Sequence, residues 1–183
     1  MTGQTKPHPS MSNTPAPAHR EPDRALRAAL SQFATGVTIV TALAPDGEPI
    51  GLTVSSFNSV SLSPPLVLWS LSHGSHSLDA FRQCEHYAIH VLAASQLELA
   101  QRFAARGVDR FAGLTCAIGL GHVPLLPDTL ATFECRNHRQ HPEGDHTIFV
   151  GEVLRCTHQA DAPPLLYHRS TLMGATSPAL EQA

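Results

Sequence analysis

Hydroxyl side chains crowd an eight-residue stretch, TVSSFNSV, at residues 53–60. A half-buried strand alternates apolar and polar side chains, but here Thr53 and Ser55 fall on one face while Ser56 and Asn58 fall on the other. Neither face is a good core face. The stretch that follows, SLSPPLVLWSL, is apolar enough to be buried. We therefore expect a polar group to need the hydroxyls of residues 53–60.

A second group of hydroxyls stands in SHGSHSLDAF, where a strand pattern gives way to a helical one. The first N–H groups of a helix lack intrahelical partners and carry a partial positive charge, so Ser75 and Ser77 beside them favour a phosphate. Ser77 could equally serve only as the N-cap of the helix. Together with the hydroxyls upstream, a phosphate site suits a mononucleotide-like cofactor.

A flavin is the cofactor that fits such a pair of segments. Its ring offers alternating acceptors and donors along one edge, which backbone amides and short hydroxyls of an irregular strand can match. A Rossmann mode of dinucleotide binding is unsupported, because Gly119 and Gly121 in IGLGHV lack the third glycine and the helix that it requires.

Twelve histidines raise the alternative of a metal site, above all His138, His141 and His146 with Glu143 and Asp145 between them. That spacing occurs in loops that wrap a metal, but a hairpin tip also collects solvated histidines, and we expect no metal. Hydrolase chemistry would need a GxSxG nucleophile elbow, which the sequence lacks.

Length and composition narrow the class of protein. The 183 residues suit one domain, and the net charge of -3 with scattered basic residues excludes an electrostatic footprint for nucleic acid or anionic lipid. Four cysteines without a CxxC pair predict reduced, mostly buried thiols. No run of about 18 apolar residues could span a bilayer, so we expect a cytosolic, cytoplasmic protein.

The pattern along the chain predicts a mainly β domain, a barrel with helices plugging or flanking it. Residues 1–22 contain five prolines and are expected to form a disordered tail, 23–170 the domain, and 171–183 a loose C-terminal tail. We expect a first helix over 24–34, capped by Asp23 and ended by Gly36, and then strands over 36–43 and 48–54 joined at Asp46-Gly47. Strands on either side of Pro64-Pro65, a helix over 78–87 and a strand over 88–94 follow. The remaining elements are a helix over 95–105 opened by a Ser95 and Glu98 capping box, a long hairpin over 130–159 and a strand over 163–169.

Several motifs in order resemble a known family. FATGVTIVTA, GLTVSSFNSVSLSPPLVLWSL, GSHSLDAF, GDHTIFVGEV and PPLLYHR, within roughly residues 24–170, resemble the short-chain NAD(P)H:flavin oxidoreductases, the flavin reductase-like FMN-binding split-barrel family. The resemblance implies a split-barrel homodimer with flavin near the subunit interface. It also implies reduction of FMN or FAD by NADH or NADPH, often for the oxygenase of a two-component flavin-dependent monooxygenase.

The resemblance also assigns roles to individual residues. It implies that the flavin ring is contacted by Thr53, Val54, Ser55 and Ser56, and that the phosphate is contacted by Ser75 and Ser77. It implies that His146, in GDH, orients the nicotinamide. A weaker match, to a basic residue followed by Phe, falls on Arg110 and Phe111. Two features depart from the family. His90 replaces an Asn that commonly lies near the flavin, and SHGSHS lacks the arginines frequent around the phosphate serines.

The chemistry asked of the protein is modest, since hydride passes from nicotinamide C4 to flavin N5 and the cofactors hold the reactivity. The fold must supply a stacked geometry with the reacting atoms about 3 to 3.5 Å apart. Two alternatives stay open: an FMN-dependent oxidase on a related split barrel, which would want a cluster of Arg and Lys, and a flavin-storing or flavin-sensing module without turnover. The sequence does not choose FMN over FAD or NADH over NADPH.

Overall fold

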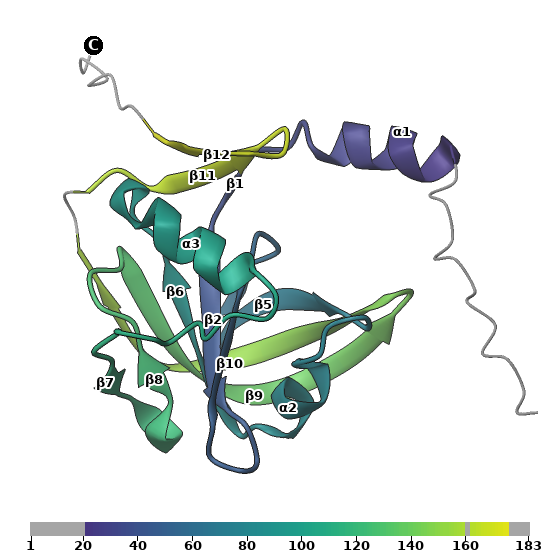
Figure 1. Ribbon diagram of the computed structural model, residues 1–183. Helices are drawn as coiled ribbons and strands as arrows, with labels where there is room; N and C mark the ends of the chain where they lie inside the picture. Colours follow the sequence, from purple (N-terminus) through teal and green to yellow (C-terminus); the bar gives the residue numbers. More distant parts are fainter. Residues whose placement is uncertain (1–20, 160–161, 176–183) are drawn as a thin grey trace, which may run out of the picture.

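The computed structural model describes residues 21–159 and 162–175 and is dominated by one curled antiparallel sheet (Figure 1). The strand order is β3-β2-β6-β9-β10-β5-β4, with β1-β11-β12 and β7-β8 as two smaller sheets. The expectation of a mainly β barrel with flanking helices is confirmed. The strands are β1 (Thr35–Gly36), β2 (Thr38–Leu43), β3 (Pro49–Val54), β4 (Asn58–Leu62), β5 (Pro65–Ser72), β6 (His86–Val91), β7 (Ala117–Ile118), β8 (Pro124–Leu125), β9 (Ala131–Glu143), β10 (His146–His158), β11 (Leu165–His168) and β12 (Thr171–Gly174).

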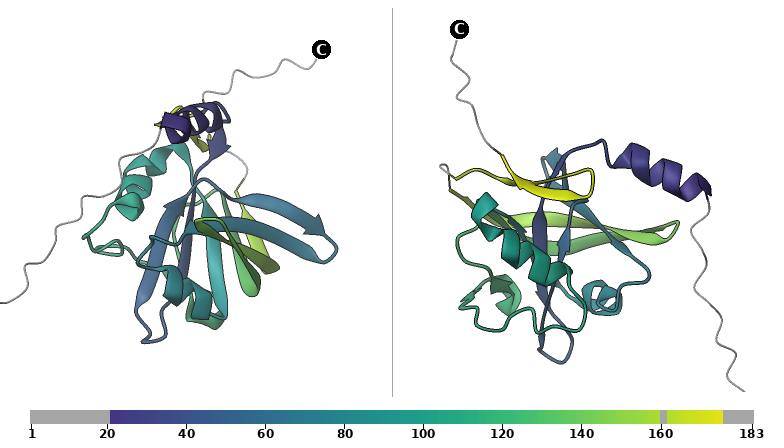
Figure 2. Two further views of the ribbon diagram at one scale, coloured as in Figure 1. Left: turned by 90° about the vertical axis from the view of Figure 1, so that its right-hand side faces the viewer. Right: turned by 45° about the horizontal axis from the view of Figure 1, so that its top comes forward.

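Helices lie outside the sheet, and one of them stands apart from it. Helix α1 projects from the body of the molecule, while α3 lies against the sheet between β3 and the small β11-β12 sheet (Figures 1 and 2). No helix among the described residues is long and apolar enough to cross a membrane. The helices are α1 (Glu21–Leu30), α2 (Leu78–Gln83), α3 (Leu97–Ala104) and two short 3-10 turns, η1 (Ala94–Gln96) and η2 (Leu120–His122).

The two edge strands of the large sheet, β3 and β4, are joined by only three residues, 55–57. This short link forces the sheet to curl until its edges approach each other. Ser56 closes the seam, because its Oγ donates to the carbonyl of Ser70 at 3.1 Å and accepts from the Ser70 amide at 2.9 Å. The Ser56 side chain thus extends the β4-β5 ladder, which accounts for one of the unexpected hydroxyls in residues 53–60.

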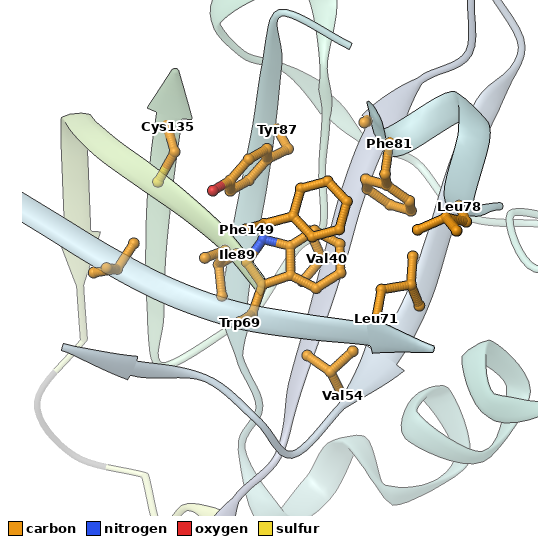
Figure 3. Close-up of a cluster of buried hydrophobic side chains, with 12 residues drawn as sticks. Val40, Val54, Trp69, Leu71, Leu78, Phe81, Tyr87, Ile89, Cys135 and Phe149 are labelled. Carbon is orange, nitrogen blue, oxygen red and sulfur yellow. The ribbon is translucent and has the colours of Figure 1, made fainter. Parts of the chain in front are cut away.

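An aromatic cluster fills the inside of the curled sheet (Figure 3). Trp69 of β5 stacks on Phe149 of β10 with ring centroids 4.6 Å apart, and it meets Phe81 of α2 edge-on at 5.1 Å. All three rings are fully buried. Burying a side chain of this size stabilises the folded state by roughly 1.5–3 kcal/mol, so the cluster holds β5, β10 and α2 in fixed relation.

Three helix boundaries differ from the sequence expectation because backbone pairing overrides local signals. Helix α1 begins before Asp23 and ends at Leu30, and Gly36 pairs with Leu166 in a strand instead of ending the helix. The helix expected over 78–87 ends at Gln83, where β6 is about to begin. The expected capping box is wrong: Gln96 Oε1 accepts from the Ala93 amide at 3.1 Å, and α3 begins at Leu97.

The predicted end of the folded domain at residue 170 also differs from the structure. Residues from 171 onward were expected to be loose, but β12 pairs along its whole length with β11. A turn at Arg169 and Ser170, both at positive φ, reverses the chain and brings Leu172 against the apolar residues under α3. The sequence of residues 171–174 alone does not indicate this contact, because the apolar residues under α3 come from distant parts of the chain. The tails expected over 1–20 and 176–183 lie outside the described residues.

Candidate functional site

A cavity of about 460 Å³ opens where three segments meet: the end of β3, the turn after β5, and the loop after α3. Four of the residues singled out in the sequence line it, namely Thr53, Ser75, Ser77 and Arg110. The other lining residues were not expected: Leu52, Ser72, Gly74, His76, Phe103, Ala104, Arg106 and Gly107. The fold therefore brings the two hydroxyl-rich segments of the sequence to one site.

The stretch after β3 divides its four candidate ring contacts between the site and the protein interior. Thr53 Oγ1 donates to the carbonyl of Ala100 in α3 at 2.7 Å, which fixes the strand end beside the cavity. Ser55 is exposed and lines the next cavity along. The side chain of Val54 is buried in the core, and Ser56 is engaged with β5. Of these four residues, Thr53 and Ser55 are the two that line a cavity.

The turn that carries the serines leaves their hydroxyls on the cavity. The amide of Ser77 donates to Ser75 Oγ at 3.3 Å, and this contact shapes the turn. Ser77 stands at the N-cap position of α2, but its side chain makes no capping hydrogen bond. Its hydroxyl therefore does not do the work of an N-cap and is available to a ligand.

Two arginines face these serines from the loop after α3. The guanidinium of Arg110 donates to the carbonyls of Gly51 at 2.7 Å and Ala105 at 2.8 Å, which engages two of its five N–H groups. Burial lowers the pKa of Arg110 from its ordinary value. Arg106 is exposed at the cavity and was missed in the sequence, although it stands four residues before Arg110. The basic charge absent from SHGSHS is thus supplied by another segment.

Phe111, the other half of the basic-Phe match, packs on the core side of the same loop. Its ring meets Phe103 edge-on with centroids 5.1 Å apart, so it anchors the loop to α3. It does not line the cavity of the serines but a neighbouring one. Phe103 in turn lies so close to Gly51 that a Cβ there would come within 2.7 Å of its ring. This packing sets the position of Arg110.

A second, more apolar cavity of about 270 Å³ continues from the first and shares Thr53 and Ala104 with it. Val37, Tyr167 and Leu172 form its walls, with Ser55 at its edge. Hydroxyls and guanidinium groups thus lie at one end of the site and apolar walls at the other. This distribution fits a flavin mononucleotide unit, whose phosphate would be held by Ser75, Ser77 and the arginines and whose planar ring would lie against the apolar walls.

His146 begins β10 one strand away from the cavity. It does not line the cavity, but it pairs in register with Ser72, which does. Its Nδ1 lies 2.7 Å from a carboxylate oxygen of Asp145, and this hydrogen bond is the main cause of a lowered Asp145 pKa. A proton on Nδ1 leaves Nε2 as the acceptor of the imidazole. The side chain is 45% exposed and therefore reachable.

His90, at a position that the family resemblance puts near the flavin, lines neither of these two cavities. The side chain is fully buried in β6. Nε2 accepts from the Leu126 amide at 3.1 Å, so Nδ1 carries the proton and donates to the Ile39 carbonyl at 3.1 Å. Burial lowers its pKa to about 4. His90 is a neutral structural cross-link between β6, β2 and the segment before β9.

In the part of the chain that the structure describes, no three His, Cys, Asp or Glu side chains gather as the ligands of a metal ion would. The four cysteines, described as free thiols, are less buried as a set than expected, since Cys156 is exposed and Cys84 and Cys116 are partly so.

Comparison with known proteins identifies the family. The family profile described as flavin reductase like domain matches residues 30–176. The chain belongs to this flavin reductase-like family. It is 52% identical over 147 residues to the FMN reductase (NADH) SmoA of Agrobacterium fabrum, which covers 80% of this chain and 83% of SmoA.

Other members of the family extend the comparison. The reductase component of a flavin-dependent trigonelline monooxygenase from Acinetobacter baylyi is 41% identical over 73% of this chain, which spans only 43% of that longer protein. Among solved structures, the NADH:FAD oxidoreductase SgcE6 of Streptomyces globisporus, in complex with NAD and FAD fragments, superposes with a TM-score of 0.81 at 35% identity, over 91% of this chain and all of SgcE6. BorF, the flavin reductase component of a bacterial two-component tryptophan halogenase, superposes with a TM-score of 0.78 at 35% identity, over 84% of this chain and 98% of BorF.

The buried neutral His90 predicts a specific loss of stability in acid. Its pKa is about 4 when folded and 6.5 when unfolded, so between these values the unfolded chain binds a proton that the folded protein excludes. The free energy of unfolding should therefore fall as pH drops through this window, by up to about 3 kcal/mol. Urea unfolding of the wild type and of His90→Gln at pH 7 and pH 4.5 should show a smaller fall for the variant. The exposed His141→Gln serves as control, and equal pH slopes for all three proteins would contradict the assignment.

Proposed function

We propose that this protein reduces free flavin with NADH in the cytoplasm and passes the reduced flavin to a separate flavin-dependent oxygenase. The observation that carries the proposal is the continuity of a cavity lined by hydroxyls and guanidinium groups (Ser75, Ser77, Arg106 and Arg110) with an apolar cavity at Thr53. Similarity to SmoA supports NADH as the donor, and the trigonelline and BorF reductase components support an oxygenase partner. The free cysteines suit a reducing compartment.

The protein's part in this reaction is to bind and to orient. A bound flavin supplies the acceptor of hydride at N5. Thr53 and Ser55 would meet the polar edge of the ring, while Val54 and Ser56 hold the backbone of the segment from inside the protein. Donors along that edge stabilise the negative charge that builds on the reduced ring.

His146 would orient the nicotinamide from β10. Asp145 accepts from Nδ1, which fixes the tautomer and leaves Nε2 to accept a hydrogen bond from the carboxamide of the nicotinamide. The carboxylate is therefore a positioning group for the imidazole. No proton transfer is asked of His146, because the reaction moves a hydride between the two cofactors.

NADH oxidation by the purified protein tests the proposal directly. We expect the absorbance of NADH to fall when FMN or FAD is added. With NADPH in place of NADH, we expect the absorbance of the nucleotide to fall more slowly. In His146→Ala the KM for NADH should rise about tenfold, the loss expected for one well-placed hydrogen bond, while the Kd for FMN stays unchanged. His141→Ala, an exposed histidine in the same hairpin, is the matched control.

Flavin binding without oxidation of either nucleotide would contradict the reductase function and favour a flavin-sensing module or an oxidase. A loss of FMN affinity in His146→Ala without a change in the KM for NADH would instead overturn only the role of this residue.

The phosphate-binding role of the serines can be separated from ring binding. Ser77→Ala should weaken FMN about fivefold and leave riboflavin unchanged, because riboflavin carries no phosphate and one hydroxyl hydrogen bond is lost. Titration of flavin fluorescence measures both constants. Ser59→Ala, on exposed β4, is the control, and equal losses for FMN and riboflavin would remove Ser77 from the phosphate site.

We also propose that the protein is a homodimer, with α1 as part of the interface. Leu26 and Leu30 of α1 are 60% and 65% exposed, and Phe33, in the turn after the helix, is 75% exposed. The helix stands away from the body of the molecule (Figure 2). Exposed apolar side chains at this spacing are typical of a helix that packs on a partner. A cavity beside them is shared with Ser55 and Tyr167, so a second copy there would also cover the ring end of the site.

Sedimentation equilibrium should give twice the chain mass of 19.6 kDa for the wild type. Leu30→Asp should shift the protein toward the monomer, because a carboxylate would be buried without a partner. Ile118→Asp, at a 74% exposed apolar position on β7, should leave the dimer intact. A monomeric wild type would contradict the proposal.

A further inference from the structure

A third cavity of about 340 Å³ opens beyond the phosphate-binding end of the site. It lies between the β2-β3 hairpin and the loop after α3. Ser77, Gly107 and Arg110 line both this cavity and the one that holds the serines. A ligand held by its phosphate at Ser77 and Arg110 can therefore continue into this space without leaving the protein surface.

The chemistry of this cavity differs from that of its neighbour. Two carboxylates, those of Glu48 and Asp109, line it in addition to the shared Ser77 and Arg110, and Pro49, Ile50 and Phe111 supply apolar surface. Asp109 Oδ1 accepts from the Phe111 amide at 3.0 Å, which orients its carboxylate. Within residues 21–159 and 162–175, the Glu48 carboxylate makes no hydrogen bond or ion pair.

This lining favours one kind of ligand end. Carboxylates repel a further phosphate, but they accept hydrogen bonds from vicinal hydroxyls, the role that an acidic residue often takes toward a nucleotide ribose. Proline, isoleucine and phenylalanine side chains offer apolar surface to a flat heterocycle. Along the two cavities, the lining thus suits first a phosphate, then a sugar and then a base.

We propose that this cavity, the adenosine cavity (Glu48, Pro49, Ile50, Asp109 and Phe111), binds the adenosine end of a dinucleotide cofactor. Its pyrophosphate lies along Ser77 and Arg110, its ribose hydroxyls donate to Glu48, and its adenine lies on the apolar side chains. The inference rests on the proposed function, because FAD and NADH are the dinucleotides of that reaction. Glu48 is then a residue that distinguishes a dinucleotide from its mononucleotide.

Glu48 is a suitable position for a test because its side chain is not part of the fold. The hairpin is held by the backbone, with the Ala44 amide donating to the Glu48 carbonyl at 2.9 Å and the Glu48 amide donating to Asp46 Oδ1 at 3.2 Å. Neither contact uses the Glu48 carboxylate, so Glu48→Ala keeps both. Glu98→Ala, an exposed glutamate in the first turn of α3, is the matched control.

The experiment compares each dinucleotide with its mononucleotide in wild type, Glu48→Ala and Glu98→Ala. Flavin fluorescence gives the Kd for FAD and for FMN, and steady-state rates give the KM for NADH and for reduced nicotinamide mononucleotide. A charge-assisted hydrogen bond to a hydroxyl predicts a loss of about tenfold for the dinucleotide that uses the cavity. The corresponding mononucleotide should bind as before, and Glu98→Ala should match the wild type.

The outcomes separate the two sources of adenosine and separate this inference from the function. A loss confined to FAD assigns the cavity to the flavin, and a loss confined to NADH assigns it to the hydride donor. No change in Glu48→Ala, or equal losses for mononucleotide and dinucleotide, overturns the inference even if the wild type reduces flavin. A wild type that binds FAD through Glu48 but oxidises no NADH would leave the cavity assigned and overturn the proposed function.

Discussion

The three-residue link between β3 and β4 is the constraint on which the site depends. These strands form the two edges of a seven-stranded sheet, so a link this short requires the sheet to curl and bring its edges together. The Ser56 hydroxyl satisfies the backbone of Ser70 at the seam. An uncurled sheet could not make this connection, and the end of β3 would then lie far from the turn that carries Ser75 and Ser77.

The surroundings of each polar side chain decide what it does in this protein. Ser56 and Ser77 carry the same hydroxyl, but Ser56 completes a sheet and Ser77 faces a cavity. His90 and His146 differ in the same way, since the buried imidazole bonds to two backbone groups and the exposed one bonds to the Asp145 carboxylate. Most buried polar groups in proteins are paired within the fold, whereas a hydroxyl at a cavity, such as that of Ser77, can bind a ligand.

Local charge at the site is independent of the net charge of the chain. The protein is acidic overall, with a net charge of -3, but Arg106 and Arg110 make the end of the cavity that carries Ser75 and Ser77 basic. The carbonyls of Gly51 and Ala105 fix the Arg110 guanidinium before any ligand binds. Such preorganisation reduces the conformational entropy lost on binding.

The sequence by itself determined the hairpins, the fold class and the family. Alternating strand patterns and the Asp46-Gly47 turn report local geometry, and the long hairpin over β9 and β10 was predicted for the same reason. Thr53, Ser75, Ser77 and Arg110 were likewise identified from sequence motifs. These features depend on residues near one another in the chain or on a pattern shared with relatives.

Only the tertiary structure decided which of these residues line the cavities. Arg106 reaches the cavity from a loop 29 positions after Ser77, β12 is stabilised by apolar residues under α3, and His90 turns inward onto Ile39 and Leu126. Each of these contacts joins segments distant in the sequence. Their energies come from burial and from pairing with backbone groups whose positions the completed fold alone fixes, so no local pattern could reveal them.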